Sequence, residues 1–323
     1  MPVLSRRRAL AWAAGTVLMA MPWVSRSQEP TIRIVVPFPA GGSADQVARL
    51  LAPHLSKRLN APVIIDNKPG ADGAIAASHV ASSAPDGRTL LLATYGAISA
   101  LPYLHAHLAY QPEKDLTPLA HMGEFSMMLF ANPDLGAKRY IELREQCQRN
   151  SIQCSYGTGN VASIVMGSWL NHHWSTHMTP VPYKGEVPAI VDLLAGRIQW
   201  MFATPTNTLG FVREGRLVAM AHVSSKRHVL APAIPSWREL GLEPFAAQPW
   251  GGIMGPAGLS ESMTLRIHQA INACLTQETS MVHDMQLQGF DPQVSRLDSL
   301  PAWLRIQSHV WEAAIVQSGL SRV

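Results

Sequence analysis

The residues best suited to binding chemistry lie in a glycine-rich segment near the N-terminus, Pro37–Asp45. This segment follows an apolar run, Thr31–Val36, and leads into residues with helical spacing. Gly41 and Gly42 have no Cβ, so a ligand can approach their backbone closely. Ser43 is a candidate N-cap, and the free N–H groups of a first helical turn favour an anion. The segment therefore predicts a site for a small carboxylate that needs no arginine.

Asp45 complicates this interpretation, because a carboxylate in the first turn competes with an anionic ligand for the same helix end. We expect its side chain to face the loop or to hold water. A plain helix-capping loop is the alternative interpretation. The segment is not a Walker loop, since no Gly-Lys-Ser/Thr follows, and it is not a Gly-x-Gly-x-x-Gly loop.

A second loop of similar kind occurs at Gly157–Ser163, where polar residues offer neutral donors. An ordinary strand-to-helix connection is the alternative. The loops after Thr94 and after Ala203 are weaker candidates for the same crevice. The candidate ligand-binding residues are Phe38, Ala40, Gly41, Gly42, Ser43, Ala44, Asp45, Thr94, Thr158, Gly159, Asn160, Ser163, Ala203 and Thr204.

No pattern in the chain argues for catalysis. The run His172–His177 contains three histidines, but no cysteine or carboxylate joins them at the spacing of a metal site, and a solvated helix end is expected. Gly-x-Ser-x-Gly and His-Glu-x-x-His motifs are absent. We therefore expect no catalytic residue, no metal and no cofactor.

The first 27 residues have the three zones of an export signal: a basic head at Ser5–Arg8, an apolar stretch at Ala9–Val24 and small residues at Ser25–Ser27. The paired arginines also fit a loose twin-arginine signal, although Ala9 stands where phenylalanine is usual. We expect cleavage after Ser27. An uncleaved N-terminal anchor is the alternative.

Removing this segment changes the charge of the protein. The chain has 26 Lys and Arg against 22 Asp and Glu, and four arginines but no acidic residue lie in 1–27. The mature chain is therefore formally neutral, and the basic character belongs to the signal. No basic stripe with interleaved aromatics follows, so we expect no nucleic-acid partner. No later stretch is long and apolar enough to cross a bilayer, so we expect the mature chain to be soluble. We also expect a monomer, although no pattern in the sequence determines the oligomeric state.

The mature chain reads as two α/β units. In the first, right-handed crossovers would put the first strand in the middle of a parallel sheet. Loops leaving the first and third strands would then flank a crevice at their carboxyl ends. The expected elements are strands 31–36, 62–66 and 89–94, a helix over 43–59 and an alanine-rich helix ending near 83.

The second unit repeats this theme without a repeat of sequence. Its expected elements are helix 138–149, strand 153–156, a helix ending near 174, strand 180–183, a helix to 195, strand 199–203, a short helix to 215 and strand 216–223. The chain then returns through Pro249–Pro256 to helices near 260–277 and 301–317. The predicted division is 28–125 with 248–323 for lobe 1 and 126–247 for lobe 2, with the crossings as a hinge.

The chain has three cysteines, Cys147, Cys154 and Cys274. In an oxidising compartment Cys147 and Cys154 could pair across a helix-to-strand connection. Two unpaired thiols are the alternative, because the sequence does not show whether their Cβ atoms can meet.

An ordered set of motifs resembles the periplasmic solute receptors of tripartite tricarboxylate transporters, the Bug receptors. The resemblance covers nearly all of the mature chain. The matching motifs are Ile34–Asp45, Asp66–Gly73, Ala84–Gly87, Val181–Gly185, Asp192–Gly196, Trp250–Gly252 and Gly255–Gly258.

This resemblance implies an α/β, two-lobe Venus-flytrap fold of the periplasmic-binding-protein type. It also implies a periplasmic receptor that closes on a small organic acid and delivers it to the permease subunits of a membrane transporter. In such receptors one ligand carboxylate lies beside the loop corresponding to Phe38–Asp45, held by backbone groups and ordered waters.

The chain also departs from the family pattern. Ala203 stands where an aspartate is frequent, and if that acid holds a ligand ammonium, an amino-acid ligand is disfavoured. Ile164 stands where a histidine is common, so specificity at the far end is not readable. Two other functions stay open: a ligand-dependent sensor that docks on a kinase, and an exported α/β enzyme that binds a nucleotide or phosphate.

Overall fold

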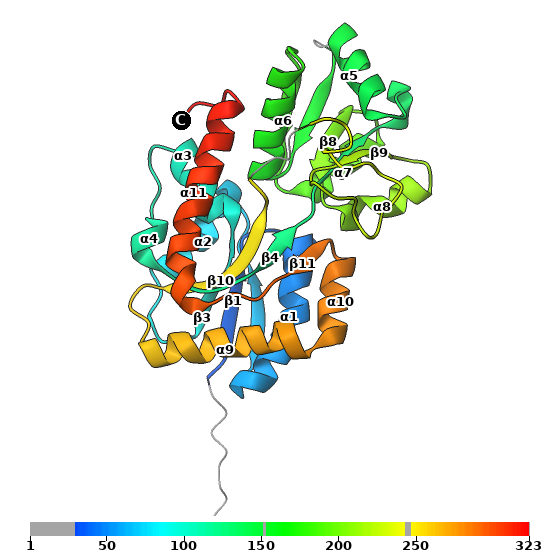
Figure 1. The fold of residues 1–323 in the computed structure, drawn as a ribbon. Helices are drawn as coiled ribbons and strands as arrows, with labels where there is room; N and C mark the ends of the chain where they lie inside the picture. The colour runs from blue at the N-terminus through cyan, green and yellow to red at the C-terminus, as the bar shows by residue number, and fades with distance from the viewer. Residues whose placement is uncertain (1–29, 151–152, 243–246, 323) are drawn as a thin grey trace, which may run out of the picture.

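The computed structural model describes residues 30–150, 153–242 and 247–322. The expected export signal, 1–27, lies outside the described residues. The rest forms two α/β halves, each built on its own sheet (Figure 1). The predicted α/β class with two sheets flanked by helices is therefore confirmed.

The first sheet has the strand order β11-β4-β10-β3-β1-β2. As predicted, β1 lies between β3 and β2 and runs parallel to both. Its residues are almost all buried, which is typical of a strand covered by helices on both faces. The strands are β1 (Ile32–Val36), β2 (Val63–Asn67), β3 (Thr89–Thr94), β4 (Leu116–Phe125), β10 (Trp250–Pro256) and β11 (Phe290–Pro292).

Helices cover both faces of this sheet (Figure 1). Apolar residues of α1, α9 and α10 share one buried cluster with β1, while α2 and α11 contribute to another. These helices are α1 (Ser43–Leu59), α2 (Ala74–Ala81), α9 (Glu261–Gln277), α10 (Thr279–Leu287) and α11 (Leu300–Gln317). Shorter helices are η1 (Ala71–Gly73), η2 (Gly96–Ala100), α3 (Leu101–Leu104), α4 (Pro112–Asp115), η3 (Pro133–Leu135) and η4 (Leu297–Ser299).

The second sheet has the order β7-β6-β8-β5-β9. Here β6 is parallel to β7 and β8, whereas β5 is antiparallel to β8 and β9. Its strands are β5 (Met128–Ala131), β6 (Ser155–Thr158), β7 (Thr179–Pro182), β8 (Trp200–Ala203) and β9 (Val218–His222). Its helices are α5 (Tyr140–Arg149), α6 (Val161–His173), α7 (Glu186–Leu194) and α8 (Pro205–Arg213).

The chain passes from the first sheet to the second between β4 and β5, and it returns between β9 and β10. None of the helices in the described part of the chain combines the length and apolar character needed to span a bilayer. The side chains of Cys147 and Cys154 are buried and form no disulfide, and their thiols are in hydrogen-bond contact with the sulfur atoms 2.8 Å apart.

Candidate functional site

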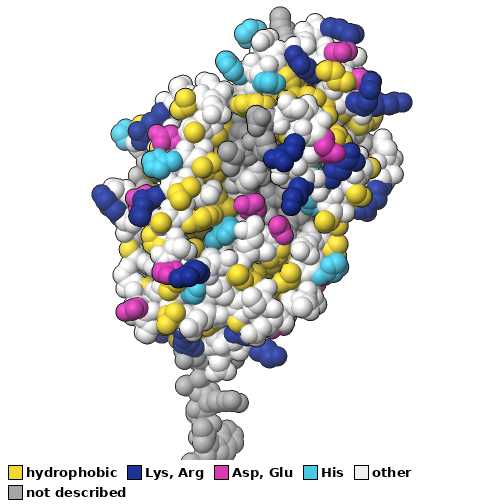
Figure 2. Space-filling model, in the orientation of Figure 1, with side chains coloured by type: hydrophobic (Ala, Val, Ile, Leu, Met, Phe, Trp, Pro, Cys, Tyr) yellow, Lys and Arg dark blue, Asp and Glu magenta, His cyan; other side chains and the backbone are white. Residues whose placement is uncertain are grey.

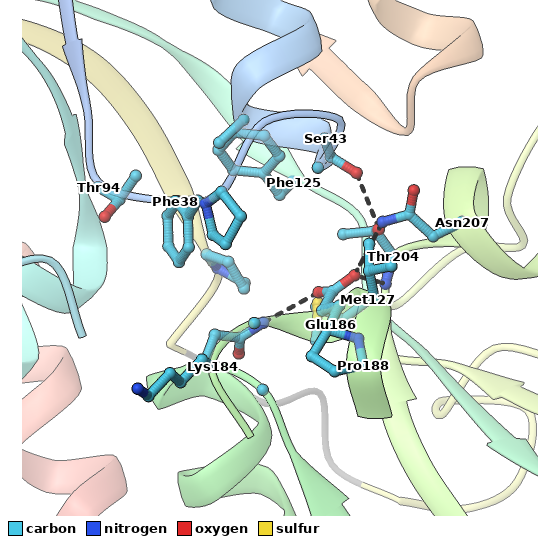
Figure 3. A pocket seen from close by; sticks show the side chains of 18 of the residues that line it. Phe38, Ser43, Thr94, Phe125, Met127, Lys184, Glu186, Pro188, Thr204 and Asn207 are labelled. Carbon is cyan, nitrogen blue, oxygen red and sulfur yellow. Dashed lines mark hydrogen bonds between the residues drawn. The ribbon is translucent and has the colours of Figure 1, made fainter. Parts of the chain in front are cut away.

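A cavity of about 230 Å³ lies between the two sheets. The loop before α1 and the end of β3 line one side of it, and the starts of α6, α7 and α8 line the other. Figure 3 shows apolar side chains, including Phe38, Phe125 and Pro188, around a small number of polar groups. This combination is typical of a small-molecule site, and the volume suits a small ligand.

The start of α1 presents backbone N–H groups to this cavity. Gly42 is the N-cap, with extended backbone and no side-chain cap. Ser43 is the first helical residue, so its prediction as the N-cap was wrong. Within the described residues, the N–H groups of Gly42, Ser43 and Ala44 have no hydrogen-bond acceptor, and all three residues line the cavity. Free N–H groups at a helix start favour an anion.

The Asp45 side chain does not compete for that position. Its carboxylate is buried beside the loop and accepts hydrogen bonds from Gly41 N at 2.9 Å, Asn67 Nδ2 at 2.8 Å and Arg49 Nε at 2.8 Å. Burial opposes its charge, but these hydrogen bonds outweigh that effect and hold the pKa of Asp45 below its ordinary value. As expected, this residue faces the loop. It therefore shapes the loop and does not line the cavity.

Thr94 lies on the same side of the cavity as the start of α1, and its hydroxyl has no hydrogen-bond partner among the described residues. Thr94 ends β3 and is 1% exposed. Because a buried hydroxyl without a partner is costly, this Oγ1 atom is available to a ligand or a water.

On the opposite side of the cavity, the polar groups at the start of α6 are hydrogen-bonded to one another. Asn160 caps this helix, and the Ser163 hydroxyl accepts the N–H groups of Gly159 and Asn160. A Cβ on Gly159 would lie 2.7 Å from the Gly185 carbonyl, so this glycine permits close approach of the chain itself. Unlike the loop before α1, the loop before α6 therefore does not leave the N–H groups of Gly159 and Asn160 free for a ligand.

Glu186 is the functional candidate that the sequence analysis missed. It begins α7, lines the cavity and accepts hydrogen bonds from Thr204 N at 3.1 Å, Thr204 Oγ1 at 2.8 Å and Asn160 Nδ2 at 2.9 Å (Figure 3). Burial raises the pKa of its carboxyl, and the hydrogen bonds offset this in part. The Lys184-Gly185 motif just before it was the available signal.

One hydrogen bond joins the two walls across the cavity, between Ser43 Oγ and Thr204 Oγ1 at 2.8 Å (Figure 3). The Thr204 hydroxyl hydrogen is directed at Glu186, so Ser43 is the donor to Thr204. A second bond between the halves runs from Ala162 N to the hydroxyl of Tyr95 at 3.3 Å. The structure therefore shows the two halves in contact.

The structure brings nine of the fourteen candidate residues to this cavity and leaves five outside it. The buried Ala203 belongs to the core of the second half, and the hydroxyl of Thr158 bonds to Val181 O. The lining candidates are Phe38, Ala40, Gly42, Ser43, Ala44, Thr94, Gly159, Asn160 and Thr204; those outside are Gly41, Asp45, Thr158, Ser163 and Ala203. Tyr95 and Asn207, which also line the cavity, belong to the loops after Thr94 and Ala203 that were weaker candidates. Lining residues that were not predicted include Phe125, Met127, Lys184, Glu186, Pro188 and Pro249.

Two α/β halves with a cavity between them define the periplasmic-binding-protein class. The structure of the periplasmic binding protein BugD superposes with a TM-score of 0.85 and 28% identity, covering 91% of this chain and 99% of BugD. MatC from Rhodopseudomonas palustris, solved with bound malate, gives a TM-score of 0.79 and 30% identity, over 89% and 99% of the two chains.

The chain belongs to the tripartite tricarboxylate transporter family receptors, whose family model matches residues 47–320. Protein BugT from Bordetella pertussis (strain Tohama I) is 31% identical over 291 residues, which is 89% of each protein. The family resemblance read from the sequence motifs is thus confirmed. Members of this family are periplasmic solute-binding receptors.

Proposed function

We propose that this protein captures a small organic carboxylate in the periplasm and delivers it to the permease subunits of a tripartite tricarboxylate-type transporter. One observation carries the proposal: the start of α1, whose first N–H groups have no acceptor among the described residues, and Thr94, whose buried hydroxyl has no partner there, line the same cavity. Together they offer an anion several hydrogen bonds and a favourable helix end without a fixed cation. The malate bound to MatC supports a carboxylate as the ligand class.

Each segment of the chain has a role in this function. Residues 1–27 would direct export, with twin-arginine-like features, and would be removed. Residues 28–125 with 248–323 would form lobe 1, and 126–247 lobe 2. A ligand that contacts both lobes stabilises the closed arrangement by its differential affinity for that arrangement. No catalytic step is required of any residue.

Replacing Gly42 with valine tests the site. A Cβ at this position contacts only the Pro39 carbonyl, at 3.6 Å, and the backbone has φ −74°, so the fold should tolerate a side chain. The added methyl groups should block access to the free N–H groups. The wild-type protein should gain thermal stability from at least one acid in a screen of carboxylates, by about 2.7 kcal/mol at 100 times its Kd, and Gly42→Val should lose this gain.

The matched control is Gly210→Val, on the exposed face of α8, where a Cβ meets open space. This variant should keep the full stabilisation by the same acid. The same screen should include nucleotides and inorganic phosphate. Stabilisation by one of these and by no carboxylate would favour the alternative of an exported enzyme that binds a nucleotide or phosphate. An unchanged ligand response in Gly42→Val would show that the ligand binds elsewhere.

A further inference from the structure

Glu186 places a carboxylate in the wall opposite the start of α1. Its Oε2 accepts hydrogen bonds from the amide and hydroxyl of Thr204 and, at 3.3 Å, from Asn207 Nδ2. Its Oε1 accepts one hydrogen bond, from Asn160 Nδ2 at 2.9 Å. The hydroxyl of Thr204 and the side-chain amides of Asn160 and Asn207 are therefore bonded to Glu186 rather than free for a ligand.

This arrangement disfavours a second carboxylate at that wall. An incoming carboxylate would find these donors occupied and would lie beside a charge of the same sign in a sheltered site. A carboxylate oxygen can accept two hydrogen bonds, so Oε1 retains an acceptor position. The geometry thus favours a ligand group that donates a hydrogen bond, and most strongly a cationic donor.

No Lys, Arg or His of the described residues neutralises Glu186. Among the described residues that line the cavity, two carry a charge, Glu186 and Lys184. Figure 3 shows the Lys184 side chain extending away from Glu186. In the part of the chain that the structure describes, no Lys, Arg or His forms an ion pair with this carboxylate, and burial raises its pKa. The charge is hydrogen-bonded but has no counter-charge.

We propose that Glu186 is a specificity-determining residue that accepts a hydrogen bond from an ammonium group of the ligand. The preferred ligand is then a small carboxylate that also carries an ammonium group. This inference rests on the proposed function, which places the ligand carboxylate at α1. It runs against the expectation drawn from Ala203, which lies outside the cavity, whereas Glu186 lines it.

Four acids with four carbon atoms provide a matched test: butyrate, succinate, 2-aminobutyrate and 4-aminobutyrate. The two amino acids place an ammonium near to or far from the carboxylate, and succinate places a second carboxylate at the far end. In titration calorimetry the wild-type protein should bind at least one amino acid ten times or more tightly than both butyrate and succinate. Adipate and 6-aminohexanoate repeat the comparison at a longer chain length.

The variant Glu186→Gln removes the charge and keeps the size of the side chain. It should reduce the ratio of amino-acid to succinate affinity at least tenfold, while Glu186→Asp, which keeps the charge, should retain part of the preference. Glu145→Gln is the control, because it removes an exposed charge of α5 far from the cavity, and it should leave the ratio unchanged. Far-UV circular dichroism and thermal unfolding check that each variant is folded.

The order of the wild-type protein's affinities for the six acids tests the inference even if Glu186→Gln fails to fold. Equal or tighter binding of the dicarboxylates by the wild-type protein would overturn the role of Glu186 and leave carboxylate capture intact. A Glu186→Gln variant with an unchanged ratio would do the same. If none of the six acids binds, carboxylate capture itself fails, and the inference fails with it.

Discussion

Asp45 holds the loop that carries the candidate anion site. Its pKa lies below the ordinary value of about 3.8 because three hydrogen bonds favour the charged form despite burial. The stability that it contributes is therefore fully present above the pKa of the unfolded chain and is lost as the pH falls through the lower, folded pKa. Asp45→Asn should cost about 1.5–3 kcal/mol at neutral pH, the usual range for hydrogen bonds to a charged group.

Urea unfolding between pH 7 and pH 3 measures this effect. The curves of the wild-type protein and Asp45→Asn should converge toward the acid end, as the wild-type carboxyl takes up its proton. Asp298→Asn is a suitable control, since its ion pair with Arg296 is exposed and should contribute little. A constant difference between wild-type and Asp45→Asn across this range would mean that the charge of Asp45 does not stabilise the loop.

The glycine segment before α1 and the residue Glu186 show how much of the site could be predicted from the sequence. The glycine segment before α1 has a local signal, because adjacent glycines and a helix start follow one another in the sequence. The Lys184-Gly185 motif marks the segment before Glu186 but not the role of its side chain, which depends on Asn160 and Thr204 from two other helix starts. Such a site is assembled only by the tertiary fold.

At the scale of elements, seven of the eleven strands in the described residues were predicted, and the four that were missed, β4, β5, β10 and β11, all pair antiparallel. The bounds of α1 and β3 agree with the prediction. The segment containing β10 was interpreted as a connection between the lobes. A Cβ on Gly252 would lie 2.3 Å from the Ala120 carbonyl. Here glycine permits close strand approach, which sequence alone does not distinguish from a loop. The antiparallel strand β4, which contains Pro118 and Gly123, was missed for a similar reason.

The end of α5 and the segment before β6 bring Cys147 and Cys154 into contact. With their sulfur atoms 2.8 Å apart, a small movement reaches bonding distance. In the periplasm, exchange with an oxidised dithiol protein would supply the disulfide and take up the two electrons. We expect the exported protein to carry this bond, which would close an eight-residue loop and stabilise the fold by roughly 2.5 kcal/mol on the chain-entropy estimate.

Alkylation of the denatured protein measures this pairing. Without reductant one cysteine, Cys274, should react, and after reduction all three should react. Cys147→Ser should expose the partner thiol and lower the unfolding temperature. Alkylation of three cysteines in exported protein that has never been reduced would contradict the expectation.

At the scale of the whole molecule, the hydrogen bond between Ser43 and Thr204 connects the anion site to lobe closure. It joins the first turn of α1 to the start of α8, and Thr204 in turn donates to Glu186. A ligand at α1 and Glu186 would therefore bind next to one of the contacts between the two halves. Binding and closure should be thermodynamically linked through this pair.

Ser43→Ala tests that link. The variant keeps the backbone N–H groups of α1 and removes one hydrogen bond that is made when the halves are in contact, worth about 0.5–1.5 kcal/mol. Ligand affinity should therefore fall by about 2- to 12-fold, and the ligand-free variant should have a larger radius of gyration in small-angle X-ray scattering. Ser82→Ala is the control, because that exposed hydroxyl donates to Ser78 O at the C-terminal end of α2, far from the contact between the halves. If Ser43→Ala binds as tightly as the wild-type protein and scatters identically with and without ligand, closure does not depend on this contact, and the halves are held together by packing elsewhere.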